Sequence, residues 1–143
     1  MSLLHLRIYG IPAPKGSKRF FRNAKTGKAI GVESNAPALG EWMQKIAAEA
    51  IMCIREAGIR PPEPPYFVML HFFLPRPKSA KKGVRYHQKR PDLDKLARAV
   101  LDALTGPIWS DDAQVSSLNL TKRYADALCV PGVYITVKTD GEG

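Results

Sequence analysis

The sequence predicts a single α+β domain with a mixed β-sheet and two principal helices. Several segments alternate or run apolar, as strands do, and two others repeat apolar residues every three or four positions, as helices do. The length of 143 residues is ordinary for one domain, so we expect one domain over 1–143. Hydrophobic residues make up 45% and charged residues 24%, a globular composition that excludes disordered and coiled-coil chains.

The first half of the chain is expected to contain a strand, a basic loop and a long helix. Apolar and polar residues alternate over 3–11, which predicts a strand with one solvent-facing side. The tract 12–28 carries Gly, Pro and many bases, which indicates a long loop or a loose hairpin extending to Val32. From Asn35 onward apolar residues recur at helical spacing, and Gly58 ends the run, so we expect a long amphipathic helix.

The second half continues the strand and helix pattern. Tyr66–Leu74 is aromatic and β-branched enough for a largely buried strand, and the basic segment 75–90 is expected to be a surface loop. Residues 93–104 place apolar side chains on one helical stripe. Val115–Tyr124 and Val133–Val137 are expected to be strands that form an antiparallel pair.

Cysteines and apolar segments indicate the compartment. Cys53 and Cys129 lack the spacing of a zinc site or a disulfide scaffold, so we expect both to be reduced thiols in the core. No apolar stretch approaches the ~18 residues that a membrane span needs. We therefore expect a cytoplasmic protein with no membrane contact.

The charges are strongly uneven. Lys and Arg number 22 against 13 Asp and Glu, and the resulting +9 indicates a polyanionic partner such as nucleic acid. Residues 1–32 contain no acid, and bases are again dense over 75–90. We expect these two tracts to follow a phosphate backbone. The candidate nucleic-acid contacts are Lys15, Lys18, Arg19, Arg22, Lys81, Lys82, Arg85, Lys89 and Arg90.

Five of the 13 acids crowd into 21 residues: Asp92, Asp94, Asp102, Asp111 and Asp112. Magnesium is a hard cation that prefers oxygen ligands, so a few converging carboxylates suffice to bind it. Phosphodiester hydrolysis uses such an ion to generate hydroxide and to neutralise charge, often with two ions ~4 Å apart. We expect the acids to gather where the second helix starts, beside the loop before residue 115.

Asp92 and Asp94 can share an ion only under one condition. On an ideal helix their side chains point about 160° apart. Pro91 favours a helix start at this position and disfavours helical geometry before it, which places Asp92 just outside the helix. The pair can then converge.

Each acidic feature also has a structural explanation. Asp92 is a good helix N-cap, and Asp94 suits the positive end of the helix dipole. Asp94, Arg98 and Asp102 can form an exposed ion-pair ladder, and the two acids before the last strands are common turn residues. The alternative function is therefore a non-catalytic nucleic-acid-binding module with its acids as caps. The combination of clustered carboxylates with two basic tracts favours a nuclease.

The acidic region resembles a known family. The resemblance rests on three runs: RPDLDKL at 90–96, LDALTG at 101–106 and WSDDAQV at 109–115. Together they are similar to the signature of the RusA family of Holliday-junction resolvases, many of which are carried by phages and prophages. The rest of the chain resembles the family in outline, and the resemblance implies a RusA-like fold.

The resemblance implies a homodimeric, Mg²⁺-dependent endonuclease that makes paired nicks in four-way junction DNA during recombination and repair. Asp92, Asp94 and Asp112 would be the essential catalytic carboxylates and metal ligands, with Asp111 a lesser contributor and Mn²⁺ an alternative ion. A two-fold symmetric junction is matched most simply by a two-fold dimer. Arg98 stands where the family has a catalytic lysine, and it keeps the charge but presents a planar fork. Lys95, which points about 60° away from Arg98 on an ideal helix, is the alternative substitute for that lysine.

Overall fold

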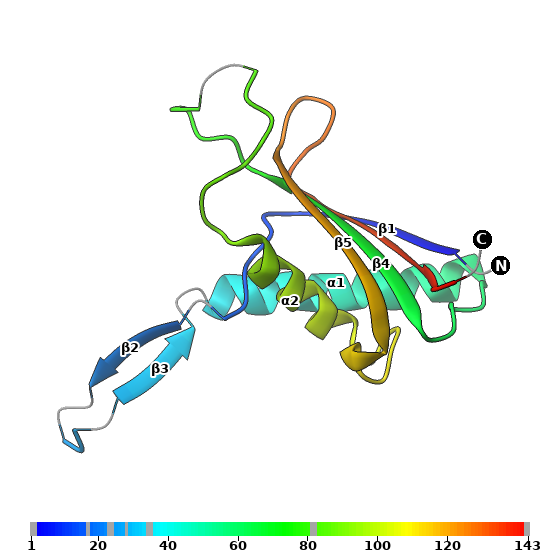
Figure 1. The fold of residues 1–143 in the computed structure, drawn as a ribbon, viewed down its shortest axis with the longest axis horizontal. Helices are drawn as coiled ribbons and strands as arrows, with labels where there is room; N and C mark the ends of the chain where they lie inside the picture. The colour runs from blue at the N-terminus through cyan, green and yellow to red at the C-terminus, as the bar shows by residue number, and fades with distance from the viewer. Residues whose placement is uncertain are drawn as a thin grey trace.

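The computed structural model describes residues 3–16, 18–22, 25–27, 29–33, 36–80 and 83–141. The elements are β1 Leu3–Tyr9, β2 Lys18–Arg22, β3 Ala29–Glu33, α1 Ala36–Ala57, β4 Tyr66–Leu74, α2 Leu93–Leu104, a 3-10 turn η1 Asp112–Gln114, β5 Val115–Tyr124 and β6 Gly132–Thr139. The predicted α+β class, with a mixed sheet and two helices, is confirmed (Figure 1). The loose hairpin predicted after residue 12 is also confirmed, because β2 and β3 pair antiparallel as a separate two-stranded sheet.

The main sheet has the strand order β1-β6-β4-β5. β6 is antiparallel to both β1 and β4, whereas β4 and β5 are parallel. The predicted pairing of the last two strands is wrong, because β4 lies between them. β4 is buried at every second position and takes a place where both of its edges are paired. The connection 125–131 then only has to cross two strand spacings, about 10 Å.

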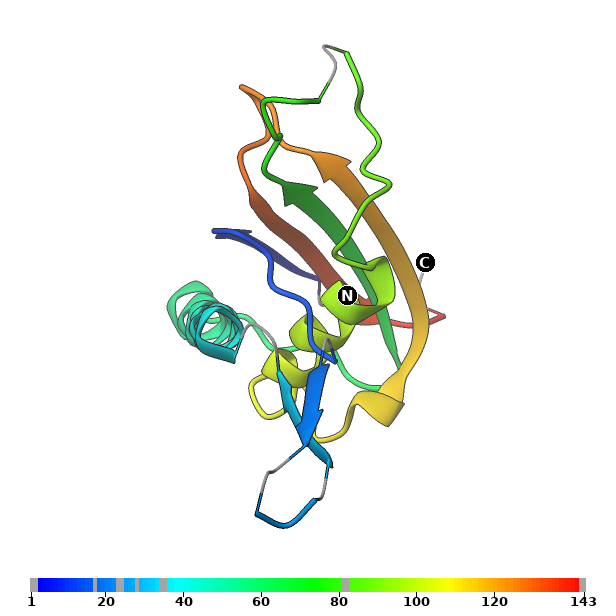
Figure 2. The same cartoon turned by 90° about the vertical axis from the view of Figure 1, so that its left-hand side faces the viewer.

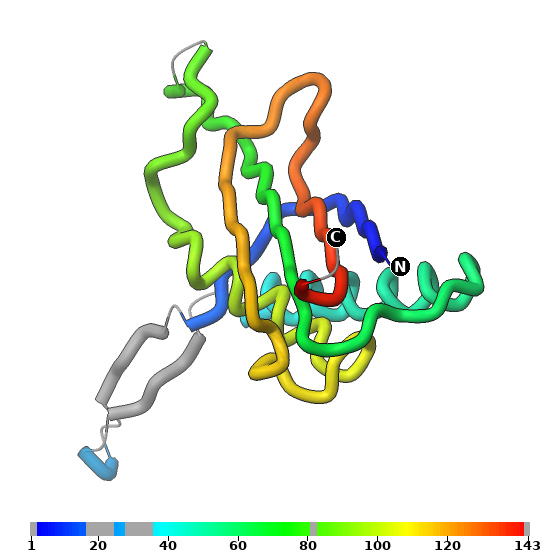
Figure 3. The backbone as a smooth tube through the Cα atoms, turned by 45° about the vertical axis from the view of Figure 1, so that its right-hand side comes forward, coloured from blue at the N-terminus to red at the C-terminus, as the bar shows by residue number. Residues whose placement is uncertain are grey.

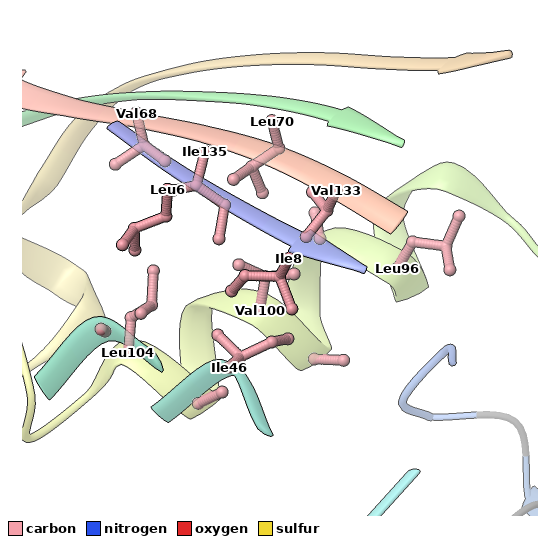
Figure 4. Packing of buried hydrophobic residues seen from close by; sticks show 14 of the residues in the cluster. Leu6, Ile8, Ile46, Val68, Leu70, Leu96, Val100, Leu104, Val133 and Ile135 are labelled. Atoms are coloured by element: carbon pink, nitrogen blue, oxygen red, sulfur yellow. The ribbon is translucent and has the colours of Figure 1, made fainter. Parts of the chain in front are cut away.

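Both helices lie on one side of this sheet (Figures 1 and 2). Alternate residues of β1 and β4 are buried, as the period of two requires for a sheet that is covered on one face. The core side chains labelled in Figure 4 fill the space between the sheet and the helices. They are Leu6, Ile8, Val68, Leu70, Val133 and Ile135 from the sheet, and Ile46, Leu96, Val100 and Leu104 from the helices. Each buried aliphatic side chain contributes about 1.5–3 kcal/mol.

The ends of the described chain lie close together (Figure 3). Leu3 of β1 pairs with Lys138 of β6, so both termini reach the same end of the sheet. At the other end of this pair, a Cβ on Gly132 would lie 2.2 Å from the carbonyl oxygen of Ile8. Glycine is therefore the residue that lets β6 begin against β1.

The cysteines partly follow the prediction. Both are free thiols and half-buried. Cys53 packs against the core from α1, but Cys129 lies in the connection 125–131 and outside the core, so its predicted core position is wrong. Over the described ranges, no helix is long and apolar enough to cross a membrane.

Candidate functional site

Asp92 lies just outside α2, as Pro91 predicted. Its backbone is extended, with φ −70° and ψ 141°, and its carbonyl accepts the first helical bond from Leu96. Its side chain nevertheless makes no capping hydrogen bond. The carboxylate lies 3.7 Å from the ammonium of Lys95 and is 54% exposed. The N-cap explanation for Asp92 is therefore wrong at the level of the side chain.

Asp94 occupies the first turn of α2 and is exposed. The ion-pair ladder along this flank is not formed, because Asp102 pairs with Lys15 at 2.6 Å. In the part of the chain that the structure describes, no ion pair joins Asp94 to Arg98. The start of α2 thus carries two exposed carboxylates that, among the described residues, make no capping hydrogen bond and no ion pair with Arg98, although Asp92 lies within ion-pair distance of Lys95.

The segment before β2 forms a strap across α2. The backbone N–H of Lys15 donates to the carbonyl of Lys95 at 3.0 Å, and its ammonium donates to Asp102. A Cβ on Gly16 would lie 2.6 Å from a guanidinium nitrogen of Arg98. Arg98 therefore lies against the strap, next to an ion pair that sequence analysis did not foresee. The sequence gives little indication that Gly16 contacts Arg98, because glycine is common in loops that are rich in lysine.

Asp111 and Asp112 have different roles in η1. Asp111 is the N-cap, and its Oδ1 accepts from the backbone N–H of Ala113 at 2.8 Å. Gln114 completes a capping box by accepting from the backbone N–H of Asp111. The turn explanation is thus confirmed for Asp111. Asp112 is exposed, and no contact ties its side chain to the rest of the described chain.

One chain does not gather the predicted acids at the start of α2. Asp92 and Asp94 lie at the N-terminal end of this helix of 12 residues, whereas Asp112 follows its C-terminal end. A helix of that length separates its ends by about 18 Å. Among the residues described, no group of three or more His, Cys, Asp or Glu side chains is arranged to hold a metal ion. The donor chemistry suits Mg²⁺, but the geometry of a single chain does not assemble the three predicted ligands.

A surface concavity of about 420 Å³ marks the C-terminal end of α2. It is lined by Asp102, Thr105, Ser110, Asp111 and Asp112. Two of these carboxylates already have partners, Lys15 for Asp102 and a backbone N–H for Asp111. Sequence analysis missed Thr105 and Ser110, since hydroxyl residues beside a helix end carry no distinctive spacing.

The second basic segment reaches the start of α2. Arg85, Lys89 and Arg90 are all exposed. The ammonium of Lys122 on β5 donates to the carbonyls of Lys89 at 2.7 Å and Pro91 at 3.0 Å, which ties this segment beside Asp92.

The remaining candidate phosphate contacts are distributed as follows. Lys18, Arg19 and Arg22 lie on β2, for which the structure describes the backbone. Lys81 and Lys82 lie outside the described residues. Lys15 is ion-paired with Asp102 in this DNA-free chain, and its contact with phosphate stays a prediction.

A basic concavity of about 400 Å³ lies near the outer end of the same segment. Arg76, Arg85 and Asp126 contribute to its lining. The backbone N–H groups of Cys129 and Leu128 lower the pKa of Asp126, and Arg76 and Arg85 lower it further. The carboxylate therefore stays ionised at neutral pH, and it offsets part of the positive charge there.

Comparison with known proteins shows what this chain is similar to. The family model described as "Endodeoxyribonuclease RusA" matches residues 10–138. An uncharacterized protein, YqaN of Bacillus subtilis (strain 168), is 28% identical over 137 residues, covering 88% of this chain and 91% of YqaN. The matched range includes the strap, both helices and every acid of the two ends of α2.

Proposed function

We propose that this chain, which belongs to the RusA endodeoxyribonuclease family, resolves four-way DNA junctions. The proposed reaction is a pair of Mg²⁺-dependent nicks, made during recombination and repair. Membership makes the chain a Holliday-junction-resolving endonuclease, a hydrolase of phosphodiester bonds. The observation that carries the finer proposal is the side chain of Asp92. It stands at a helix N-terminus without capping it, which favours a ligand role over that of a structural cap.

The proposed cofactor is Mg²⁺, with Mn²⁺ as the alternative ion. Its ligands would be Asp92, Asp94 and Asp112, with Asp111 contributing less because its Oδ1 already accepts a hydrogen bond. A bound ion of this kind supplies an activated water and neutralises phosphate charge. Because these carboxylates do not converge within one chain, the proposed metal site needs ligands from two chains.

Arg98 is proposed to lie beside the scissile phosphate. A guanidinium keeps its charge at any physiological pH and matches phosphate oxygens with a two-pronged donor set. Its neighbour one turn on, Asp102, pairs with Lys15 rather than with Arg98. Lys89 and Arg90 are proposed to hold the adjoining phosphates, since they are exposed and precede the start of α2, and Arg85 is proposed to hold a phosphate further along the same segment.

A homodimer is proposed because it can complete the site. β5 is an edge strand of the main sheet, and edge strands pair readily with another chain. Near its C-terminal end the edge already bonds the same chain, since the Tyr124 N–H donates to the Arg85 carbonyl, so the part of the edge that begins at Val115 is the part proposed to pair. Asp112 precedes the start of β5, whereas Lys122 near its end contacts Pro91, beside Asp92. Two β5 edges set antiparallel about a two-fold axis would bring Asp112 of each chain toward the start of α2 in the other.

The test is cleavage and binding of a synthetic four-way junction with and without Mg²⁺. Asp94→Asn removes a charge at nearly constant volume, so cleavage should be lost while junction binding holds or strengthens. Glu56→Gln, an equal charge change on the exposed side of α1, is the matched control and should cleave normally. Junction binding by the wild type without cleavage, whether or not Mg²⁺ is added, together with loss of binding by Asp94→Asn, would instead support the non-catalytic binding module.

A further inference from the structure

The main sheet has a second face, which no helix of the described ranges covers, because α1 and α2 lie on the other side (Figures 1 and 2). We call it the outer face, meaning the side chains of β1, β4, β5 and β6 at the positions that alternate with the core residues. Residues of this face are exposed or half-buried, in alternation with the core residues of the same strands. None of these residues belongs to the proposed nicking site.

The outer face carries basic side chains and no acidic ones. The four strands that build it contain no Asp or Glu, although the chain has 13 of them. Arg7, Lys138 and Arg123 contribute positive charge. The nearest carboxylate, Asp140, follows β6 at the rim and accepts hydrogen bonds from the hydroxyls of Ser116 and Ser117. Such a face attracts a polyanion and repels a second copy of itself.

Aromatic rings on this face lie against its basic side chains. The guanidinium carbon of Arg7 lies 4.5 Å from the ring centroid of Tyr134 and 5.1 Å from that of Tyr9. Phe73 contacts the same Tyr134 ring at 5.0 Å, and Lys138 lies 5.0 Å from the ring of Phe67. Planar side chains arranged in this way form a platform on which unpaired bases stack, whatever their sequence.

A groove of about 290 Å³ crosses the centre of the platform. Met69 belongs to its lining, and around it lie His5, Arg7, His71 and Tyr134. The imidazole of His5 hydrogen-bonds the hydroxyl of Thr136 at 3.0 Å, so polar groups are fixed at the edge of an otherwise apolar hollow. A nucleobase has this same combination, an apolar face and a polar edge. A base in a duplex offers no such face, because its neighbours cover it.

We propose that the outer face binds single-stranded DNA, with one unpaired base in the groove against Tyr134 and the backbone phosphates on Arg7 and Lys138. This site lies on the opposite side of the sheet from α2, so it is distinct from the proposed nicking site. It would let the protein hold an unpaired strand while the acids act on a junction.

The first test is binding of a fluorescein-labelled oligothymidylate, followed by anisotropy in EDTA. Tyr134→Ala and Arg7→Gln should each weaken binding about tenfold, the size expected when one stacked base loses its platform. Arg55→Gln removes an exposed base from the last turn of α1, away from the outer face, and is the matched control that should bind normally. Equal affinity of Tyr134→Ala and the wild type would overturn the proposal.

A second measurement uses the wild-type chain and so does not depend on how variants fold. An oligonucleotide carrying 5-bromouracil is photo-crosslinked, and the adducts are mapped by mass spectrometry. Adducts at Met69, His71 or Tyr134 support the proposal, whereas adducts confined to 12–28 and 75–90 overturn it. Protection of the outer face from footprinting in the DNA-free protein would show that a second copy covers it, which also overturns it. Junction nicking measured in parallel keeps this result separate from the nuclease proposal.

Discussion

The two ends of α2 carry acids of the same sequence signature, but the acids at the two ends differ in how many contacts they make with the rest of the fold. At the N-terminal end, Asp92 and Asp94 are exposed, and Asp92 makes no capping hydrogen bond, its one described partner being the ammonium of Lys95 at 3.7 Å. At the C-terminal end, Asp102 is ion-paired and Asp111 caps η1, which leaves Asp112 as the acid without a structural partner there. The comparison separates Asp102 and Asp111, which stabilise the fold, from Asp92, Asp94 and Asp112, which are proposed to bind the metal ion. The one sequence signature therefore contains both kinds of acid.

The largest expected difference is between Asp92 and Asp111. Asp92→Asn should lower junction cleavage by at least about a hundredfold, as expected if it is a metal ligand, and should leave thermal unfolding unchanged. Asp111→Asn keeps a side-chain oxygen that can cap η1, so cleavage should fall far less. Single-turnover nicking rates and calorimetry of both variants decide the matter. Equal loss of cleavage in the two would end the distinction between the ends of α2.

A second prediction concerns whether the two ends act across a dimer. Asp94→Asn and Asp112→Asn should each be inactive alone, whereas a mixture refolded together should recover part of the nicking activity. In a mixed dimer, one shared site receives both substitutions and the other receives neither. The control is Asp94→Asn mixed with Asp92→Asn, which should stay inactive because both changes fall on the same side of the site. No recovery in the first mixture would place each complete site within one chain.

The third prediction tests the structural role of Asp111 directly. Asp111→Ala removes the acceptor for the Ala113 N–H, and loss of such a cap costs about 1 kcal/mol. The melting temperature should therefore drop by about 3 °C. Asp112→Ala, one residue further on, removes no described hydrogen bond and should melt as the wild type does. Destabilisation by the latter change would show that Asp112 too belongs to the fold.

The smallest effect is expected for the ion pair of the strap. Lys15 and Asp102 are 36% and 30% exposed, so solvent screens their attraction, and a double-mutant cycle with Lys15→Met and Asp102→Asn should give about 0.5 kcal/mol. The measurement is urea unfolding of the two single variants and the double variant. A coupling of several kcal/mol would mean that the strap anchors α2 far more firmly than a surface pair can.

Local pattern determined much of this protein from sequence alone. The bounds of β4, α2 and β5 follow from periods of two and of 3.6 residues, which depend only on neighbouring side chains. Pro91 likewise indicated that the helix begins just after it, and Asp92 has the extended geometry of a residue outside the helix. The signature over 90–115 likewise indicated the family that the match over 10–138 shows.

Tertiary structure alone decided how those elements meet. The insertion of β4 between β5 and β6, the pairing of Lys15 with Asp102, and the gathering of Arg7, Tyr134 and His71 into one groove all join residues far apart in the chain. The length of α2, by contrast, follows from the sequence, and it separates Asp92 from Asp112. The long-range contacts depend on which apolar faces bury one another, and the period of any single segment carries no information about that choice.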